Sequence, residues 1–114
     1  MEIFQEEKYH RLLISQARLD QAALNEFQKL VAPLVESNVH LIVNAEKVVE
    51  IEKPVSEALI RIAEEQAEKS CTFVIVNNEP KVVAAFDDEL AIVPTESEAV
   101  DYFNFDELER QYNL

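Results

Sequence analysis

Residues 39–63 read VHLIVNAEKVVEIEKPVSEALIRIA and combine two strand patterns with a helix pattern. Residues 39–43 form a continuous apolar run apart from His40, which is typical of an inner strand covered on both faces. A shorter strand is expected over residues 48–51. Pro54 suits the first turn of a helix, because the N–H that proline lacks would have no partner there. Apolar residues then recur at helical spacing and predict a helix that packs on a sheet: Val55, Ala58, Leu59, Ile62 and Ala63.

Strands and helices alternate on both sides of this stretch. Strands are expected over residues 3–5 and 9–14, which would form a hairpin, and over residues 73–76 and 90–93. Because helical segments separate the later strands, the central strands should run parallel.

Capping and breaking residues indicate three further helices. Asp20 is a good N-cap for the first of them, and Pro33 should bend or shorten its last turn. Residues 78–80 (Asn-Glu-Pro) open a short helix. Residues 95–98 (TESE) form a capping box, in which the first and last residues are expected to bond each other's free backbone N–H groups. Residues 106–114 could add a further helical turn or two.

The chain contains no glycine among its 114 residues. This excludes a P-loop and a Rossmann fingerprint, since both need glycine where the backbone approaches phosphate. Turns must rely on Asn, Asp and Ser, which occur at residues 37–38, 77–78 and 87–88. The length and a hydrophobic content of 48% fit one domain. The sequence therefore predicts a single α/β domain over residues 1–114, with a mixed, mostly parallel sheet, an N-terminal antiparallel hairpin and about four helices.

The chain is strongly acidic, with 23 Asp and Glu against 10 Lys and Arg. Such a surface repels nucleic acid and anionic membranes, and it favours a partner with a basic patch. The N-terminus shows no signal-peptide pattern, and the apolar runs are too short to span a membrane. Cys71 is the single cysteine and cannot form an internal disulfide. A cytoplasmic protein is expected.

Five segments follow one another in a characteristic order: ARLDQAALNEFQKLVAPL, HLIVNAEKV, SEALIRIAEE, FVIVNNEPKVVAAF and LAIVPTESEAVDYF. In this order the chain resembles the STAS domain, the fold of the bacterial anti-sigma-factor antagonists. Shared features are a Leu-Asp step into the first helix, an apolar strand that ends in Asn, and a last strand followed by a capped helix. The resemblance covers roughly residues 8–104 and leaves residues 105–114 as a C-terminal tail.

The chain departs from this family at the start of the second helix. The antagonists carry Asp-Ser-Ser-Gly or a close relative there, and a partner kinase phosphorylates their serine. In the register set by Ala58 and Leu59, Glu52 stands for the aspartate and Lys53 for the serine, so the phosphorylation site is degenerate. Ser56 is the nearest hydroxyl and a candidate substitute. The resemblance places the partner-binding surface at Glu50, Glu52, Lys53, Pro54, Ser56 and Glu57.

A catalytic site would have to start from Cys71, His10 or His40. Cys71 enters a buried strand of an acidic chain, which should raise its pKa and favours a core role over a nucleophile. His40 is interpreted as a core or sheet-face residue and His10 as a solvent-facing one. No catalytic residue is expected.

Metal binding has two candidate positions. Glu50 and Glu52 alternate along a strand and share one face, but no His, Cys or Asp lies at ligand spacing beside them. Residues 87–89 (Asp-Asp-Glu) are interpreted as a polar turn. No metal or cofactor is expected at either position.

The aromatic residues near the C-terminus either pack in the core or form an exposed patch for a partner. Phe103 is expected in the core, and the sequence leaves Tyr102 and Phe105 open.

The sequence thus predicts a non-catalytic protein-interaction module, resembling an anti-sigma-factor antagonist without the regulatory phosphoserine. The resemblance implies a protein partner such as a kinase-like anti-sigma factor. Two alternatives stay open: a structural or self-associating scaffold subunit, possible as a homodimer, and a domain that binds a small ligand or lipid in an apolar pocket.

Overall fold

The structure is a computed structural model that describes residues 1–112. The elements within these residues follow in chain order: β1 (Glu2–Gln5), β2 (His10–Leu13), β3 (Arg18–Leu19), α1 (Gln21–Glu36), β4 (Leu41–Asn44), β5 (Glu50–Ile51), α2 (Lys53–Glu68), β6 (Phe73–Val76), α3 (Pro80–Ala84), β7 (Ala91–Val93) and α4 (Glu96–Tyr112).

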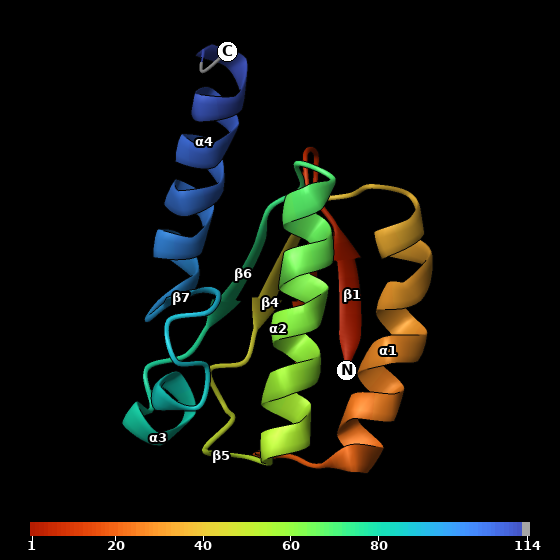
Figure 1. The fold of residues 1–114 in the computed structure, drawn as a ribbon, viewed down its shortest axis with the longest axis vertical. Helices are drawn as coiled ribbons and strands as arrows, with labels where there is room; N and C mark the ends of the chain where they lie inside the picture. Colours follow the sequence, from red (N-terminus) through yellow and green to blue (C-terminus); the bar gives the residue numbers. More distant parts are fainter. Residues whose placement is uncertain (113–114) are drawn as a thin grey trace.

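Five strands form the central sheet in the order β1-β2-β4-β6-β7 (Figure 1). β1 runs antiparallel to β2, whereas β2, β4, β6 and β7 are mutually parallel. β3 and β5 form a separate parallel pair, in which Arg18 lies opposite Glu50. The predicted α/β class, antiparallel hairpin and mostly parallel sheet are confirmed.

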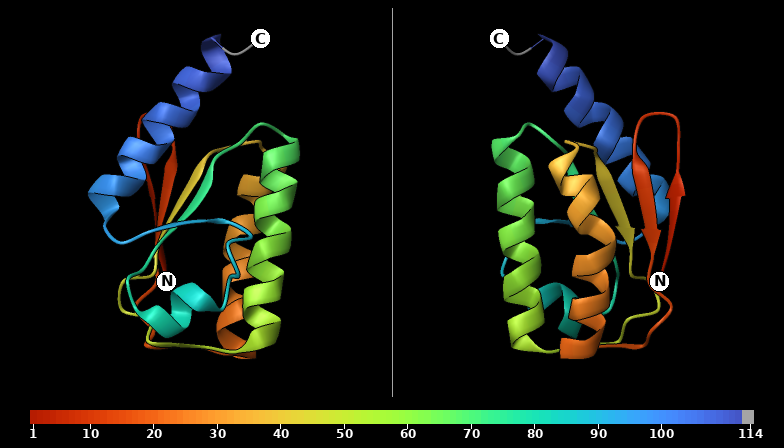
Figure 2. Two further views of the ribbon diagram at one scale, coloured as in Figure 1. Left: turned by 60° about the vertical axis from the view of Figure 1, so that its left-hand side comes forward. Right: turned by 90° about the vertical axis from the view of Figure 1, so that its right-hand side faces the viewer.

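Helices cover both faces of the sheet (Figure 2). α1 and α2 lie on one face with α3 near their N-terminal ends, and α4 crosses the other face. The larger core lies under α1 and α2 and includes Leu12, Phe27, Leu41, Val43, Leu59 and Phe86. The smaller core lies under α4 and consists of Ile42, Val74, Val76, Ala99 and Phe103. β4 and β6 are buried along their whole length because they supply side chains to both cores.

Local sequence explains where the helices begin. The Asp20 carboxylate accepts a hydrogen bond from the N–H of Ala23 at 3.0 Å, as predicted for the N-cap of α1. In the capping box of α4 the Glu98 N–H donates to Thr95 Oγ1, at 3.2 Å. The Glu98 carboxylate accepts from the Thr95 hydroxyl rather than from the Thr95 N–H. The second hydrogen bond of the capping box is therefore one between two side chains.

Two features differ from the sequence-based expectations, and a third, the helical tail, agrees with them. α1 continues through Pro33 to Glu36, so this proline does not end the helix. The strand β3 was not predicted, because two residues are too short to show a period. The expected tail continues α4 without a break as far as Tyr112, and residues 113 and 114 lie outside the described residues.

Polar residues make the turns that glycine makes in other chains. Asn38, Asp87 and Asp88 have positive φ, in agreement with the turns predicted there. Ser70 also has a positive φ of 59°, at a turn that the sequence analysis did not single out.

Asn77 ties together the loops that follow two neighbouring strands. It is 1% exposed, and its Nδ2 donates to the carbonyls of Ala45 (2.7 Å) and Val48 (2.9 Å). Its Oδ1 accepts from the N–H of Glu79 at 2.7 Å. This side chain therefore fixes both the path from β4 into β5 and the start of α3.

Candidate functional site

The carboxyl ends of the parallel strands carry the segment that the sequence analysis selected. β5 and the N-termini of α1, α2 and α3 all lie at this end of the molecule (Figure 1). Loops at the carboxyl ends of parallel strands are where open α/β sheets commonly place binding sites. The segment from Glu50 to Glu57 is therefore in a position suited to recognition.

Arg18 forms ion pairs with Glu50, which lies in β5, and with Glu52, which directly follows β5. Its Nε lies 2.9 Å from Glu50 Oε2, and its NH2 lies 2.9 Å from Glu52 Oε2. Glu52 directly follows β5 as the N-cap of α2, and both carboxylates reach the same guanidinium, so the two glutamates point to the same side. The side chains of Arg18 and Glu50 are 57% and 64% exposed, so this cluster adds little stability.

Lys53 is the first residue of α2 and lies beside this cluster. It is exposed, and α2 begins without a side-chain cap because its N-cap is Glu52. Within residues 1–112 no carboxylate forms an ion pair with Lys53; its neighbours Glu50 and Glu52 pair with Arg18 instead. Arg18, rather than Lys53, thus neutralises the two glutamates of this cluster.

Ser56 does not lie on the surface. It is 2% exposed, and its hydroxyl donates to the carbonyl of Lys53 at 3.0 Å. Its inclusion in the partner-binding surface was wrong on this point, because the helix turns its side chain toward the core. A kinase could reach this hydroxyl only if the first turn of α2 opened.

Together with Arg18, the remaining residues form one surface at this end of the molecule, in which Glu52 is half-buried and the others are exposed. We call it the clamp surface: Arg18, Glu50, Glu52, Lys53, Pro54 and Glu57. Val49, which is 55% exposed, borders it on the side of β5. Sequence reasoning missed Arg18 and Val49. The Arg-Leu-Asp step before α1 was a usable signal for Arg18, but nothing local pairs it with residues more than thirty positions away.

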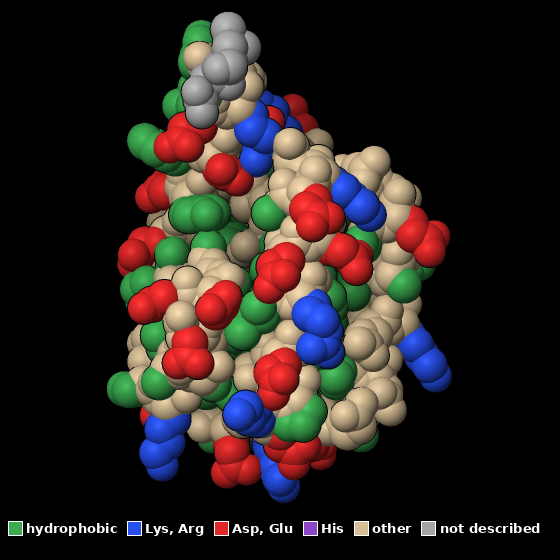
Figure 3. Space-filling model, in the orientation of Figure 1, with side chains coloured by type: hydrophobic (Ala, Val, Ile, Leu, Met, Phe, Trp, Pro, Cys, Tyr) green, Lys and Arg blue, Asp and Glu red, His purple; other side chains and the backbone are tan. Residues whose placement is uncertain are grey.

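Acidic and basic side chains are mixed at the end of the molecule that holds β5 and the start of α2 (Figure 3). Elsewhere on the same view, acidic side chains outnumber basic ones, as the net charge of −13 requires.

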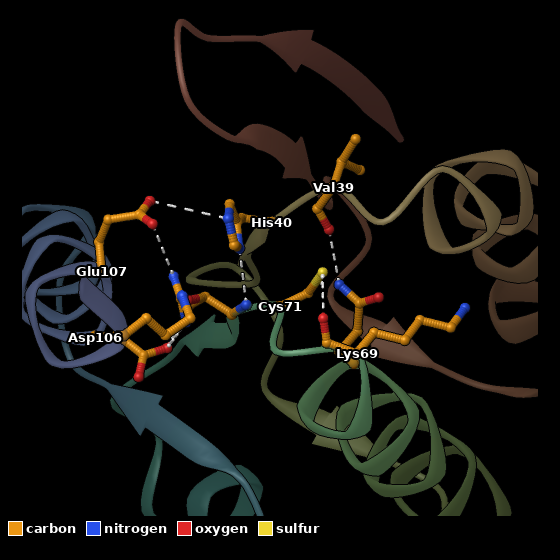
Figure 4. A network of polar contacts seen from close by, with 9 residues as sticks. Val39, His40, Lys69, Cys71, Asp106 and Glu107 are labelled. Atoms are coloured by element: carbon orange, nitrogen blue, oxygen red, sulfur yellow. Dashed lines mark hydrogen bonds and ion pairs between the residues drawn. The ribbon is translucent and has the colours of Figure 1, made fainter. Parts of the chain in front are cut away.

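Cys71 and His40 lie in one network of polar contacts, in which each side chain is hydrogen-bonded to a backbone group (Figure 4). The Cys71 thiol lies 3.6 Å from the Lys69 carbonyl, and His40 Nδ1 accepts the Thr72 N–H at 3.0 Å. Burial raises the pKa of the Cys71 thiol, as predicted, although the nearby charges of Arg110 and Lys69 act in the opposite direction. Of the two reasons given from the sequence, burial is the one that acts, and no acidic side chain contributes to the shift of this pKa. This arrangement does not present an activated thiolate beside a free base.

The same network fastens α4 to the sheet. Thr72 Oγ1 donates to Asp106 Oδ2 at 2.6 Å, and Arg110 NH1 donates to the same oxygen at 2.8 Å. His40 Nε2 lies 3.9 Å from Glu107 Oε2. His40 is thus a satisfied, half-buried residue at the start of β4, as interpreted from the sequence. His10 is half-buried in β2 rather than fully solvent-facing.

The environment of His40 predicts a pH effect on stability. Burial, followed by Arg110, lowers its pKa below the usual 6.5, against the weaker opposing effects of Glu107 and Asp106. The unfolded state therefore binds a proton more readily than the folded state, so this contribution is present above about pH 6.5 and is lost as pH falls through the folded pKa. Wild type should lose stability relative to His40→Asn between about pH 7.5 and about pH 5.5.

Asparagine is the matched control, because it can offer an acceptor near the Nδ1 position without titrating. The urea midpoints of both proteins are measured at the two pH values. Carboxylates are the same in both proteins, so the difference between their pH dependences reports His40. Equal pH dependence of wild type and His40→Asn would contradict the assignment.

No group of three or more potential metal-ligating side chains occurs within residues 1–112. The pair Glu50 and Glu52 faces Arg18 instead. Residues 87–89 form the turn before β7. No helix in the described part of the chain has the length and apolar character needed to cross a membrane.

Comparison with known proteins supplies a structural likeness but no match in sequence. The sequence matches no protein-family model and no curated protein. A solved chain from the structure described as "Molecular architecture of the stressosome, a signal integration and transduction hub" superimposes with a TM-score of 0.65. The match has 14% sequence identity and covers 90% of this chain and 96% of that chain. This likeness shows the fold, an α/β domain of the STAS-like type, as the sequence predicted.

Proposed function

We propose that this chain is a non-catalytic protein-interaction module of the anti-sigma-factor-antagonist type, which binds a protein partner through the clamp surface. The observation that carries the proposal is the exposed Lys53 at the first position of α2, free of ion pairs within the described residues. The STAS resemblance places the phosphorylated serine at this position. The fold likeness to a chain of the stressosome, a signal integration and transduction hub, supports a signalling role.

Lys53 makes the expected binding constitutive. Phosphorylation of a serine adds close to two negative charges, and in the phosphorylated family this releases the partner. Lysine cannot be modified by a serine kinase and carries the opposite charge. The partner proposed is a kinase-like anti-sigma factor or another member of such a switching assembly. Phosphorylation at position 53 would not regulate this complex.

A structural subunit of a larger assembly is the second candidate, since the stressosome likeness also fits a scaffold role. Sizing and light scattering over a range of concentrations distinguish a self-associating scaffold from a monomeric binder. A lipid carrier has less support. A pocket of about 410 Å³ near the C-terminal end of α2 is lined by charged residues as well as apolar ones, among them Glu64, Glu89, Asp106 and Arg110.

Reversing the charge at Lys53 should weaken the partner complex while the isolated domain stays folded. Lys53→Glu places a carboxylate beside Glu52 and opposite whatever partner group Lys53 meets, and we expect at least about a tenfold loss of affinity. The partner is first purified through its binding to the wild-type protein. Isothermal titration calorimetry at low and high salt then measures its affinity for each variant.

Arg61→Glu is the matched control, because the same change of net charge falls on an exposed residue two turns further along α2. Its affinity should stay close to that of wild type. If Lys53→Glu binds with unchanged affinity and salt dependence, the clamp surface is not the interface.

A further inference from the structure

α4 presents an apolar face to solvent in the half of the helix that extends past the sheet. Phe105, Leu108 and Tyr112 are 65%, 51% and 77% exposed and recur at spacings of three and four residues. They therefore form one stripe along the helix. We call these three residues the α4 stripe. In Figure 3, hydrophobic side chains lie among acidic ones along this helix.

The polarity of this half of α4 is the reverse of what an isolated domain needs. The side turned toward the sheet carries Asp106, Glu107 and Arg110, which bond or pair with Thr72, His40 and one another. The outer side carries the α4 stripe. An amphipathic surface helix normally buries its apolar face and exposes its polar one. The apolar outer side therefore stays exposed to solvent in the folded domain, as far as residues 1–112 show.

The charges beside the stripe select the kind of molecule that covers it. Asp101 and Glu109 are exposed, and their helical positions fall on the outer side of α4, within a turn of the stripe residues. The one basic residue of α4, Arg110, is turned inward and shared between Asp106 and Glu107. The stripe is therefore flanked by carboxylates, which favour an apolar partner bordered by Lys and Arg.

We propose that the α4 stripe binds an amphipathic helix of another protein, with apolar residues on one face and basic residues at its edges. A second copy of this chain fits poorly, because two copies meeting through this face would bring the same carboxylates together. The three side chains also expose on the order of 400 Å², about half of what each partner buries in a standard interface. An anionic membrane would be repelled by the same carboxylates.

This site is separate from the clamp surface. The C-terminal half of α4 and the start of α2 lie at opposite ends of the molecule (Figure 1). The proposal therefore does not rest on the function proposed for Lys53, and either can fail alone.

The test uses three synthetic peptides of the length of α4. The first forms a helix with leucines on one face and lysines at its edges, the second replaces the lysines by glutamates, and the third scrambles the first. Fluorescence anisotropy measures their binding to the full chain. The first peptide should bind at least about tenfold more tightly than the other two, since it alone has both the apolar face and the matching charge.

Substitutions then locate the site. Phe105→Ser combined with Leu108→Ser should weaken binding of the lysine peptide at least about tenfold. Asn104→Ser combined with Gln111→Ser, which changes two exposed polar residues of the same helix outside the stripe, should leave it within about twofold. Circular dichroism verifies that both variants keep their helix content.

Three results would overturn the proposal. Equal binding of the scrambled peptide would reduce the effect to general charge attraction. Concentration-dependent self-association that disappears in the double variant would assign the stripe to a second copy. Sedimentation with zwitterionic vesicles that depends on Phe105 and Leu108 would assign it to a lipid surface.

Discussion

Phe103→Ala should lower the free energy of unfolding by about 3–5 kcal/mol. Phe103 is 1% exposed and fills the smaller core between α4 and the sheet. Its ring centroid lies 5.2 Å from that of Tyr9 and 5.1 Å from that of His40. Alanine would remove these contacts and leave a cavity that the short strands of the sheet cannot close. Urea denaturation followed by circular dichroism measures the change.

Phe105→Ala is the matched control, two residues further along the same helix. Phe105 is 65% exposed, so the substitution should change stability by about 0.5 kcal/mol or less. Similar losses at both positions would mean that α4 packs on the sheet through a different face. The pair also separates folding from binding, because Phe105 belongs to the α4 stripe and Phe103 does not.

Asn77→Ala should cost about 3 kcal/mol. The substitution removes three hydrogen bonds and leaves the carbonyls of Ala45 and Val48 and the N–H of Glu79 without their partner, at roughly 1 kcal/mol each. Asn77→Asp should be no better tolerated, since it keeps the acceptor but turns a negative oxygen toward two carbonyls. Chemical denaturation of both variants provides the values.

Asn78→Ala serves as the control, because Asn78 is exposed and directly follows in the chain. It should alter stability by about 0.5 kcal/mol or less. A loss for Asn78→Ala as large as that for Asn77→Ala would show that the loop tolerates neither change for a reason other than these hydrogen bonds.

The elements with a clear period or cap were predictable from the sequence. The apolar run over β4, the strand β6 and the helix that begins near Pro54 appear where the pattern placed them. The N-cap Asp20 is a local signal that involves contacts a few residues apart. Such features depend on neighbouring residues, so a single sequence contains what is needed to find them.

The features that were missed depend on distant parts of the chain. Arg18 meets Glu50 and Glu52 only after β3 and β5 have paired, and each of those strands is two residues long. The inward turn of Asp106 and Arg110 depends on Thr72 at the start of β6. Without these contacts the apolar residues of α4 could be assigned to the core or to the surface equally well, which is why Tyr102 and Phe105 were left open; both are exposed.

Ser56 was misplaced for a different reason. The resemblance drew attention to the first hydroxyl after the phosphorylation position, whereas the helix places that side chain at the core. The helical period set by Val55, Ala58 and Leu59 leaves Ser56 on the edge of the buried face. The clamp surface consequently owes its polar character to Arg18, Lys53 and the glutamates.

Site-specific photo-cross-linking from position 53 in a native lysate tests whether the clamp surface contacts a protein partner. A photoreactive amino acid in place of Lys53 should give a discrete adduct with one protein, and the same amino acid in place of Arg61 should not. Unlabelled wild-type chain in excess should suppress the adduct, whereas unlabelled Lys53→Glu should compete much less well. No adduct from position 53, or the same adduct from positions 53 and 61, would contradict the claim that the clamp surface is the interface.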